Sequence, residues 1–422
     1  MTCSADILIY GDGTEQNLGV VVGQDGADGA DGADDEDGAD GQNGADGDAG
    51  ADGADGSLVI TTAGSSIPAA SAKGLRSAVS IVCNFQATVQ QGGWWPGSGS
   101  ITQEYSSAGS GVIFQMDKAE GDAFIMTNYH VVYDASSQTE NGISDDISVY
   151  LYGSEIADKA IRATYVGGSL YYDIAVIRIE DSDVLKDSDA CAVDVADSDG
   201  VVVGDSAIAI GNAQGLGISS TSGVISVGSE YITMTAADGK TTVSFRVMRV
   251  DAAVNSGNSG GGLFDEEGNL IGIVNAKIVY EGVENIGYAI PSNIAVSIAE
   301  NIIDYCYGTD TERAQRAWLG ITVSTSDSKA VYDTETGMIA IEETVSVYEV
   351  SPGSPADGIL QENDVILSVT LNGTTTEVTR EYHITDIMLV VRAGDTIQLR
   401  VLRGGEELHV SIAITEECLT EY

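Results

Sequence analysis

Short runs of hydrophobic residues follow one another from about residue 75 to about residue 305. Each run is rich in Val, Ile, Phe and Tyr and is bounded by clusters of Gly, Asp, Asn and Ser, which is the pattern of short strands joined by turns. The predicted strands are Val79–Cys83, Gly111–Gln115, Ala123–Thr127, Ile147–Tyr152, Ile174–Ile179, Ser206–Ile210, Gly223–Val227, Thr242–Val250 and Leu270–Val274. Many short strands of this kind favour a mainly β fold of the barrel type.

The pattern changes at Pro291. From Pro291 to Cys306 the apolar residues recur at helical spacing, with Ser292 or Asn293 as the candidate N-cap, so we expect a helix that closes the β-rich domain. A second unit follows from about residue 315 to about residue 415, with a predicted helix near Ile384–Val391. A length of 422 residues agrees with two or three domains.

The N-terminal segment has neither pattern. Residues 1–66 contain no Lys or Arg, and from Gly23 to Gly56 a glycine occupies every third position, with Asp35 as the one interruption. Period-three glycine is typical of a collagen-like triple helix. Proline is absent from the repeat, however, and no lysine pairs with its aspartates, so three strands would repel one another. A disordered acidic stalk is therefore favoured over a triple helix.

Composition excludes several classes of protein. The formal net charge of −47 argues against a nucleic-acid partner, because phosphate binding needs a basic surface. Five cysteines occur at wide spacing without CxxC or Cys/His patterns, so we expect no disulfide framework and no metal site. No apolar stretch reaches membrane-spanning length, and no signal peptide is recognisable. Met1–Asp6 resembles the start of a mature lipoprotein with Cys3 lipidated, and a misassigned start codon explains these residues equally well.

Candidate chemistry is concentrated at Gly257–Phe264, with the sequence GNSGGGLF. A serine among small residues can turn its Oγ outward while neighbouring backbone N–H groups converge on one point. Attack on a carbonyl requires this combination of a nucleophile and an oxyanion hole. Gly-rich turns around a serine are common, so this segment alone is also compatible with an ordinary tight loop.

Two further segments favour the catalytic interpretation. His130 lies in TNYHVV and Asp173 in YYDIAVIRI, which gives the chain order His130, Asp173, Ser259. His130 is also the only histidine before His383. Together with DAAVNSGNSGGGLF and NIGYAIPSN, these segments resemble the HtrA (DegP-type) trypsin-like serine proteases over roughly residues 75–415.

The resemblance implies a role for each residue. Ser259 would be the nucleophile, His130 the general base and then acid, and Asp173 the residue that orients the imidazole. The backbone N–H groups of Gly257 and Ser259 would form the oxyanion hole, with Asn258 between them. In this fold the floor of the S1 pocket lies six residues before the nucleophile, which is Ala253 here. A wall from the Ile273–Asn275 segment, including Val274, would complete a small apolar pocket for Val, Ala, Ile or Leu.

The C-terminal unit contains a second resemblance. Trp318, Leu319, Gly320 and Ile321 resemble the carboxylate-binding loop of a PDZ domain, and the later segments VSPGSPA and ENDVI follow the same pattern. Such a loop would bind the C-terminus of a peptide, which then adds as a strand beside residues 321–323. A small β-rich domain without peptide binding is the alternative.

We therefore expect an acidic segment at residues 1–66, a chymotrypsin-like double β-barrel protease domain at 67–308 and a PDZ domain at 315–416. The resemblance implies an extracytoplasmic endopeptidase that needs no cofactor, a homotrimer that cleaves unfolded or damaged envelope proteins and is regulated by peptides at its PDZ groove. Two alternatives are a stalked scaffold protein without catalysis and a chaperone whose protease is mostly inactive.

Overall fold

The computed structural model describes residues 7–9, 15–17, 66–90, 100–139, 141–154, 159–276, 286–309, 314–332, 334 and 337–421. The chain divides into two units, Met1–Ile60 and Thr61–Tyr422. In the first unit, β1 (Ile7–Ile9) and β2 (Glu15–Asn17) pair as antiparallel strands. The glycine repeat and Cys3 lie outside the described residues, so the stalk and the lipid anchor stay predictions.

The first part of the second unit is a closed antiparallel barrel with the strand order β3-β4-β5-β8-β7-β6. Its strands are β3 (Ala78–Gln90), β4 (Ser100–Asp117), β5 (Asp122–Thr127), β6 (Asp146–Leu151), β7 (Ile161–Ser169) and β8 (Ile174–Ile179). Inward-facing residues such as Ile81, Ile125 and Ile177 are fully buried in one core. The short helices α2 (Tyr129–Val132) and α3 (Asp183–Lys186) follow β5 and β8.

A second closed barrel follows, with the order β10-β11-β14-β13-β12-β9. Its strands are β9 (Ser206–Gly211), β10 (Ser219–Thr235), β11 (Thr242–Val250), β12 (Gly262–Phe264), β13 (Leu270–Val274) and β14 (Gly287–Pro291). Every residue of the last three strands is buried. The turns η2 (Ser198–Gly200) and η3 (Ala213–Gly215) flank β9.

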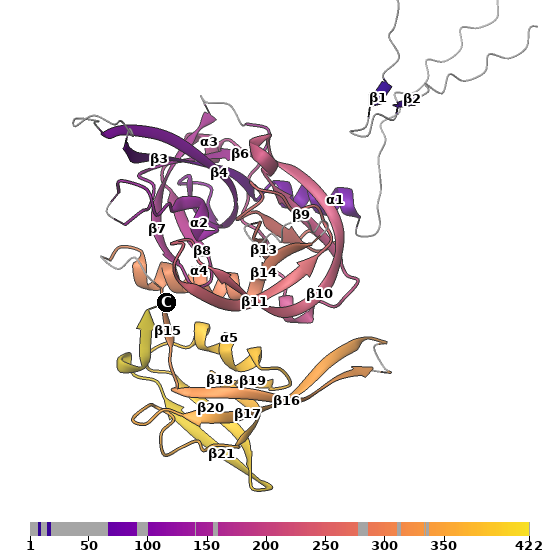
Figure 1. Ribbon diagram of the computed structural model, residues 1–422, viewed down its shortest axis with the longest axis vertical. Coiled ribbons are helices and arrows are strands. Elements are labelled where there is room, and N and C mark those ends of the chain that lie inside the picture. Colours follow the sequence, from indigo (N-terminus) through magenta and orange to yellow (C-terminus); the bar gives the residue numbers. More distant parts are fainter. Residues whose placement is uncertain are drawn as a thin grey trace, which may run out of the picture. The chain divides into compact units, whose positions relative to one another are not determined.

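Two helices pack on the barrels (Figure 1). Helix α1 (Ile67–Leu75) begins at Ser66, whose side chain caps the N–H of Ala69. Helix α4 (Ser292–Cys306) contacts β7, β8 and β13 and buries Ile294, Ile298 and Ile302, which recur every four residues along one face. The helix is the predicted one, but its N-cap is Pro291 rather than Ser292 or Asn293.

The C-terminal part is a sheet with the order β16-β17-β18-β20-β21, and β19 pairs with β18. The strands are β16 (Ile321–Tyr332), β17 (Ile339–Val350), β18 (Val365–Leu371), β19 (Thr374–Glu377), β20 (Thr396–Arg403) and β21 (Glu406–Ala413). Helix α5 (Tyr382–Val390) starts two residues before the predicted helix. Strand β15 (Gln315–Ala317) pairs with β22 (Leu419–Glu421), which follows η4 (Glu416–Cys418).

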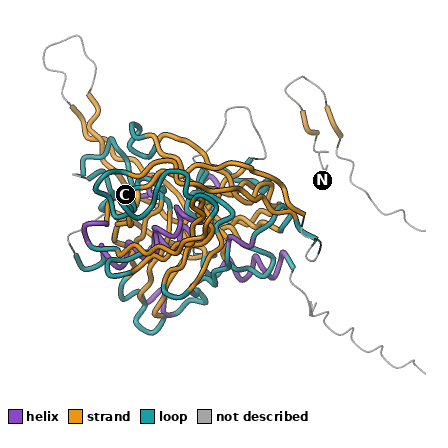
Figure 2. The backbone as a smooth tube through the Cα atoms, turned by 90° about the horizontal axis from the view of Figure 1, so that it is seen from below, coloured by secondary structure: helices purple, strands orange, loops and turns teal. Residues whose placement is uncertain are grey.

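Strands dominate the chain, as Figure 2 shows, and the predicted mainly β architecture is confirmed. Among the described residues, no helix has the length and apolarity that crossing a membrane would require. The domain limits at 67–308 and 315–416 stay predictions.

Candidate active site

His130 stands in the short helix α2, directly after strand β5 ends at Thr127. Thr127 is fully buried, and its hydroxyl donates to the carbonyl oxygen of Ser110 at 2.7 Å. Asn128 is equally buried, and its side-chain amide donates to the carbonyl oxygen of Asp173 at 2.9 Å. The segment before His130 is thus fixed both to β4 and to the turn that carries the predicted aspartate.

Asp173 lies in the turn between β7 and β8 and has a φ of 56°. This left-handed conformation is uncommon for a residue with a Cβ and persists where surrounding contacts hold it. Tyr129 and Asn128 both donate to the Asp173 carbonyl oxygen. The strained turn therefore places the carboxylate next to the start of α2.

The Asp173 carboxylate holds His130 at two points. Oδ2 lies 2.6 Å from His130 Nδ1, and Oδ1 accepts the His130 backbone N–H at 2.9 Å. The two side chains are 19% and 7% exposed, so little water competes for these bonds. A proton on Nδ1 leaves Nε2 as the nitrogen that can accept one, which is the arrangement a general base requires.

A third residue, Asn275, contacts the same carboxylate. Asn275 is fully buried, and its Nδ2 donates to Asp173 Oδ2 at 2.9 Å. It follows β13, in the segment that the sequence assigns to a pocket wall, and its contact with Asp173 was not predicted. The two residues are 102 positions apart, and no motif in the sequence links them.

Ser259 lies in a tight loop against the segment that carries His130. Its carbonyl oxygen accepts from Ser110 N at 2.8 Å, and the next N–H, of Gly260, donates to Val274 at 2.9 Å. A Cβ on Gly260 would overlap Ser110 O and Thr127 Oγ1, so only glycine permits this approach. Within the described residues, Ser259 Oγ makes no hydrogen bond to His130, and catalytic hydrogen bonds of this kind often form only with substrate bound.

The predicted oxyanion hole depends on the direction of one peptide group. The carbonyl oxygen of Ser256 accepts from Gln214 N at 2.7 Å. In a trans peptide the C=O and N–H point in opposite directions, so the N–H of Gly257 points away from Gln214. In the described part of the chain, the N–H groups of Gly257 and Ser259 donate to no protein acceptor, whereas that of Asn258 donates to Asn255 O at 3.0 Å. Two of the three predicted residues therefore leave an N–H available for an oxyanion.

Two family models match this chain. A trypsin-like peptidase domain covers residues 109–273, and a PDZ domain covers residues 317–414. The serine protease Do-like HtrA of Lactococcus lactis subsp. cremoris is 33% identical over 323 residues, which are 74% of this chain and 72% of that protein. The chain belongs to the HtrA family. It is a serine-type endopeptidase with a trypsin-like peptidase domain and a C-terminal PDZ domain.

Further comparisons agree with membership of the HtrA family. The chain is 32% identical to the serine protease Do-like HtrA of Bacillus subtilis and spans 66% of its length. It is 30% identical to the periplasmic serine endoprotease DegP of Escherichia coli, and the matched region covers 77% of this chain and 60% of DegP. A solved structure of the HtrA-type protease AlgW with a decapeptide matches 85% of this chain and 99% of that one, with 26% identity and a TM-score of 0.51.

In this HtrA protein the two predicted S1 residues have different surroundings. Ala253 is exposed, and its carbonyl oxygen accepts from Thr221 Oγ1 at 2.9 Å. Val274 is 1% exposed and packs in the core of the second barrel with Ala252. Residues 277–285, after the predicted wall, lie outside the described residues. The preference for aliphatic residues stays a prediction.

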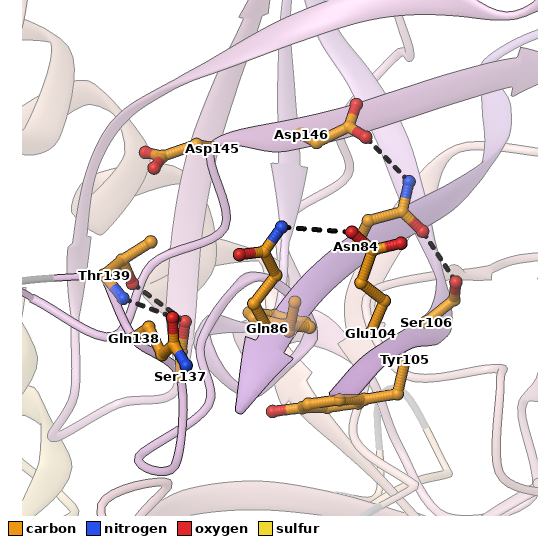
Figure 3. Close-up of a pocket in the computed structure, with 11 residues that line it drawn as sticks. Asn84, Gln86, Glu104, Tyr105, Ser106, Ser137, Gln138, Thr139, Asp145 and Asp146 are labelled. Atoms are coloured by element: carbon orange, nitrogen blue, oxygen red, sulfur yellow. Dashed lines mark hydrogen bonds between the residues drawn. The ribbon is translucent and has the colours of Figure 1, made fainter. Parts of the chain in front are cut away.

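The peptidase domain also contains a cavity of about 620 Å³ that is separate from these residues (Figure 3). Asn84, Gln86, Glu104, Tyr105 and Asp146 line it with others, and none of His130, Asp173 and Ser259 does. Asn84 donates to Asp146 and Gln86 to Glu104, so part of its polar surface is already paired.

The PDZ domain has a groove where the sequence predicts one. A cavity of about 130 Å³ lies between the start of β16 and helix α5, and its lining includes the four predicted residues Trp318, Leu319, Gly320 and Ile321 together with Arg316, Ala317, Val323, Ile384, Thr385 and Met388. Gly320 has a φ of 75°, and a Cβ there would overlap the side chain of Ser354. Leu319 O and Gly320 O accept from Ala356 and Ser351, which fixes the loop to the following turn.

Proposed function

We propose that this protein cleaves polypeptides through an acyl-enzyme on Ser259. The arrangement that carries the proposal is the partly buried His130–Asp173 pair, held at 2.6 Å, beside a serine loop with two unused N–H groups. Nε2 of His130 takes the Ser259 proton as Oγ attacks the scissile carbonyl, and the N–H groups of Gly257 and Ser259 bind the oxyanion. His130 then donates the proton to the leaving amine, and a second cycle with water releases the acyl group.

The proposed substrates are unfolded or damaged proteins outside the cytoplasm. DegP, a relative with 30% identity, is named as a periplasmic endoprotease, which supports an extracytoplasmic location. The net charge of −47 favours neutral or basic unfolded chains over acidic ones, because long-range repulsion slows the approach of acidic chains. The homotrimer stays part of the proposal and is supported by family membership alone.

Peptide binding at the PDZ groove is proposed to regulate the peptidase. Two residues that line the groove also contact the peptidase domain. Arg316 Nη1 donates to the hydroxyl of Tyr172 at 3.3 Å, and Tyr172 precedes Asp173 in the chain. Thr385 Oγ1 lies 3.1 Å from the hydroxyl of Tyr231 on β10. A peptide that moves either groove residue would therefore act on the peptidase domain directly.

The decisive experiment replaces the proposed nucleophile. Ser259→Ala should lower the rate of cleavage of reduced casein to background and should abolish labelling by a fluorophosphonate, because the nucleophilic hydroxyl is removed. The fold should be retained, since the side chain loses one oxygen atom only. His130→Ala should do nearly the same, since the serine loses its base. Ser226→Ala, at an exposed serine on β10 outside this loop, is the control and should retain activity. Full activity of purified Ser259→Ala would refute the assignment.

A further inference from the structure

Strands β16 and β17 continue beyond the peptide groove as a long hairpin (Figure 1). Each strand has 12 residues, and their pairing runs from Ile321 opposite Val350 to Tyr332 opposite Ile339. β16 is the first strand in the sheet order, and among the described strands it pairs with β17 alone. The outer edge of β16 therefore presents backbone N–H and C=O groups along its whole length.

One face of this hairpin is apolar and exposed. Tyr332 lies opposite Ile339, and Ala330 opposite Ile341, so these four side chains share a face. Tyr332 is 61% exposed, Ile339 64% and Ile341 41%, so all three are large hydrophobic residues that remain exposed to solvent. We refer to Ala330, Tyr332, Ile339 and Ile341 as the hairpin strip.

The hairpin strip lies on the same side of the sheet as the peptide groove. Alternate residues of a strand share a face, so Ile339 and Ile341 lie on the face that carries the buried Val345 and Val347 of β17. Val347 pairs with Val323, which lines the groove. A β-bulge at Asp327, where φ is 54°, separates the groove from the strip without reversing the face of β17.

We propose that the hairpin strip binds the segment upstream of a C-terminal peptide held in the groove. This inference rests on the proposed binding of peptides at the PDZ groove and extends it to a longer ligand. With its carboxylate at Leu319–Ile321, a peptide antiparallel to β16 runs from the groove towards Tyr332. At about 3.3 Å per residue, residues about eight to ten positions before the C-terminus reach the strip.

The ligand is therefore an extended polypeptide with aliphatic or aromatic residues at alternate positions in that upstream segment. An unfolded chain supplies both the free backbone groups for the β16 edge and the apolar side chains for the strip. The strip and the groove lie on the same face of the sheet and along the same edge strand, β16. This placement favours a peptide over a second copy of the protein, since four side chains are few beside the ~800 Å² per partner of a stable interface. The acidic residues Asp327, Glu342 and Glu343 of the hairpin disfavour contact with an anionic lipid surface, and so does the net charge of −47 of the whole chain.

The test measures peptide binding by the full chain carrying Ser259→Ala, which removes cleavage. The probes are a fluorescent peptide of about 12 residues, ending in Val and carrying Leu eight and ten positions before its end, and a second probe that consists of its last four residues. Burial of one or two leucines on the strip should make the longer peptide bind about tenfold more tightly or better. Replacing both upstream leucines with Ser should abolish this difference.

Variants of the strip locate the contact. The double variant Tyr332→Ser, Ile339→Ser should bind the longer peptide only as tightly as the short one, with unchanged affinity for the short one. Tyr348→Ser is the matched control, because Tyr348 is 66% exposed on the same hairpin and lies outside the strip. Since all three side chains are exposed, the variants should melt at the temperature of the parent protein.

Three results would overturn the inference. Equal affinities of the two peptides would show that the ligand ends at the groove, while peptide binding by the PDZ domain would stand. Binding of neither peptide would overturn both proposals. The third result is a variant at Tyr332 and Ile339 that leaves peptide affinity unchanged. Loss of an oligomer in sedimentation would then assign the strip to contact with a second copy of the protein, and loss of binding to anionic vesicles would assign it to lipid.

Discussion

Gly257→Ala tests whether the direction of one peptide group controls catalysis. Gly257 has a φ of 95°, a conformation that costs a residue with a Cβ about 1–2 kcal/mol. A Cβ there would overlap Asn212 O and lie 2.8 Å from Gln214 N. These backbone atoms belong to the turn that anchors the Ser256 carbonyl oxygen, so the alanine cannot be accommodated without moving the Ser256–Gly257 peptide.

The expected loss follows from the role of that peptide. If its N–H turns away, the oxyanion retains one donor, from Ser259, and the loss of one donor typically lowers kcat by about 10²–10³, or ~3–4 kcal/mol of barrier. KM should change little, because the donor acts mainly on the transition state. Initial rates on an unfolded protein substrate, measured over a range of concentrations, separate the two constants.

Controls distinguish a catalytic effect from a folding effect. Gly200→Ala introduces the same methyl group where no atom lies within 4 Å and the backbone is not left-handed, so its activity should equal that of the parent. The double variant Gly257→Ala, Ser259→Ala should be no slower than Ser259→Ala alone, because the two residues act in one step. A kcat of Gly257→Ala within about threefold of the parent, in a protein that melts normally, would show that the oxyanion is bound elsewhere.

Two further substitutions test contacts away from the serine. Asn275→Ala removes a buried hydrogen bond to the Asp173 carboxylate, so kcat should fall about 10–100-fold and the pH dependence of kcat should shift, whereas an unchanged pH profile would make Asn275 purely structural. Burial raises the pKa of the Asp386 carboxyl to about 6, although the charge of Arg246 opposes the shift. The ionised carboxylate that prevails above about pH 6 is therefore less favourable in the folded protein than in the unfolded chain. The change in the free energy of unfolding caused by Asp386→Asn should therefore be ~1–3 kcal/mol more favourable near pH 7.5 than near pH 4, as measured by denaturant titration; equal effects at both pH values would contradict this reasoning.

Several strands that bury apolar residues could be predicted from the sequence, whereas exposed strand segments and short strands in Gly-rich segments were missed. Ala123–Thr127 and Leu270–Val274 were predicted within a residue of β5 and β13, because their side chains fill the barrel cores. β4 begins at Ser100 rather than at the predicted Gly111, since its first half is largely exposed and its polar residues show no apolar alternation. β12 has three residues in a Gly-rich segment and is a strand because β9 and β13 pair with it on either side.

The same distinction applies to the site. His130, Asp173 and Ser259 could be proposed because each lies in a short motif whose residues also build the local turn. Asn275 could not, because its role depends on a contact across 102 positions that only the closure of the second barrel creates. Gln214, whose N–H fixes the Ser256 carbonyl oxygen, acts through its backbone, so its side-chain identity carries no signal at all.

Helix α5 contacts both the peptide groove and the peptidase domain, and no local sequence pattern predicts the second contact. Ile384 and Met388 line the peptide groove, whereas Asp386 lies 2.7 Å from Arg246 Nη2 of the peptidase domain. Arg246 is 2% exposed and also pairs with Asp199, so it cannot regain water unless the helix moves away. A peptide can shift this equilibrium only by binding the two arrangements of α5 with different affinity. Arg246 belongs to β11, which ends at Val250, and the loop of Ser259 follows in the chain, so the strand that α5 contacts also leads to that loop.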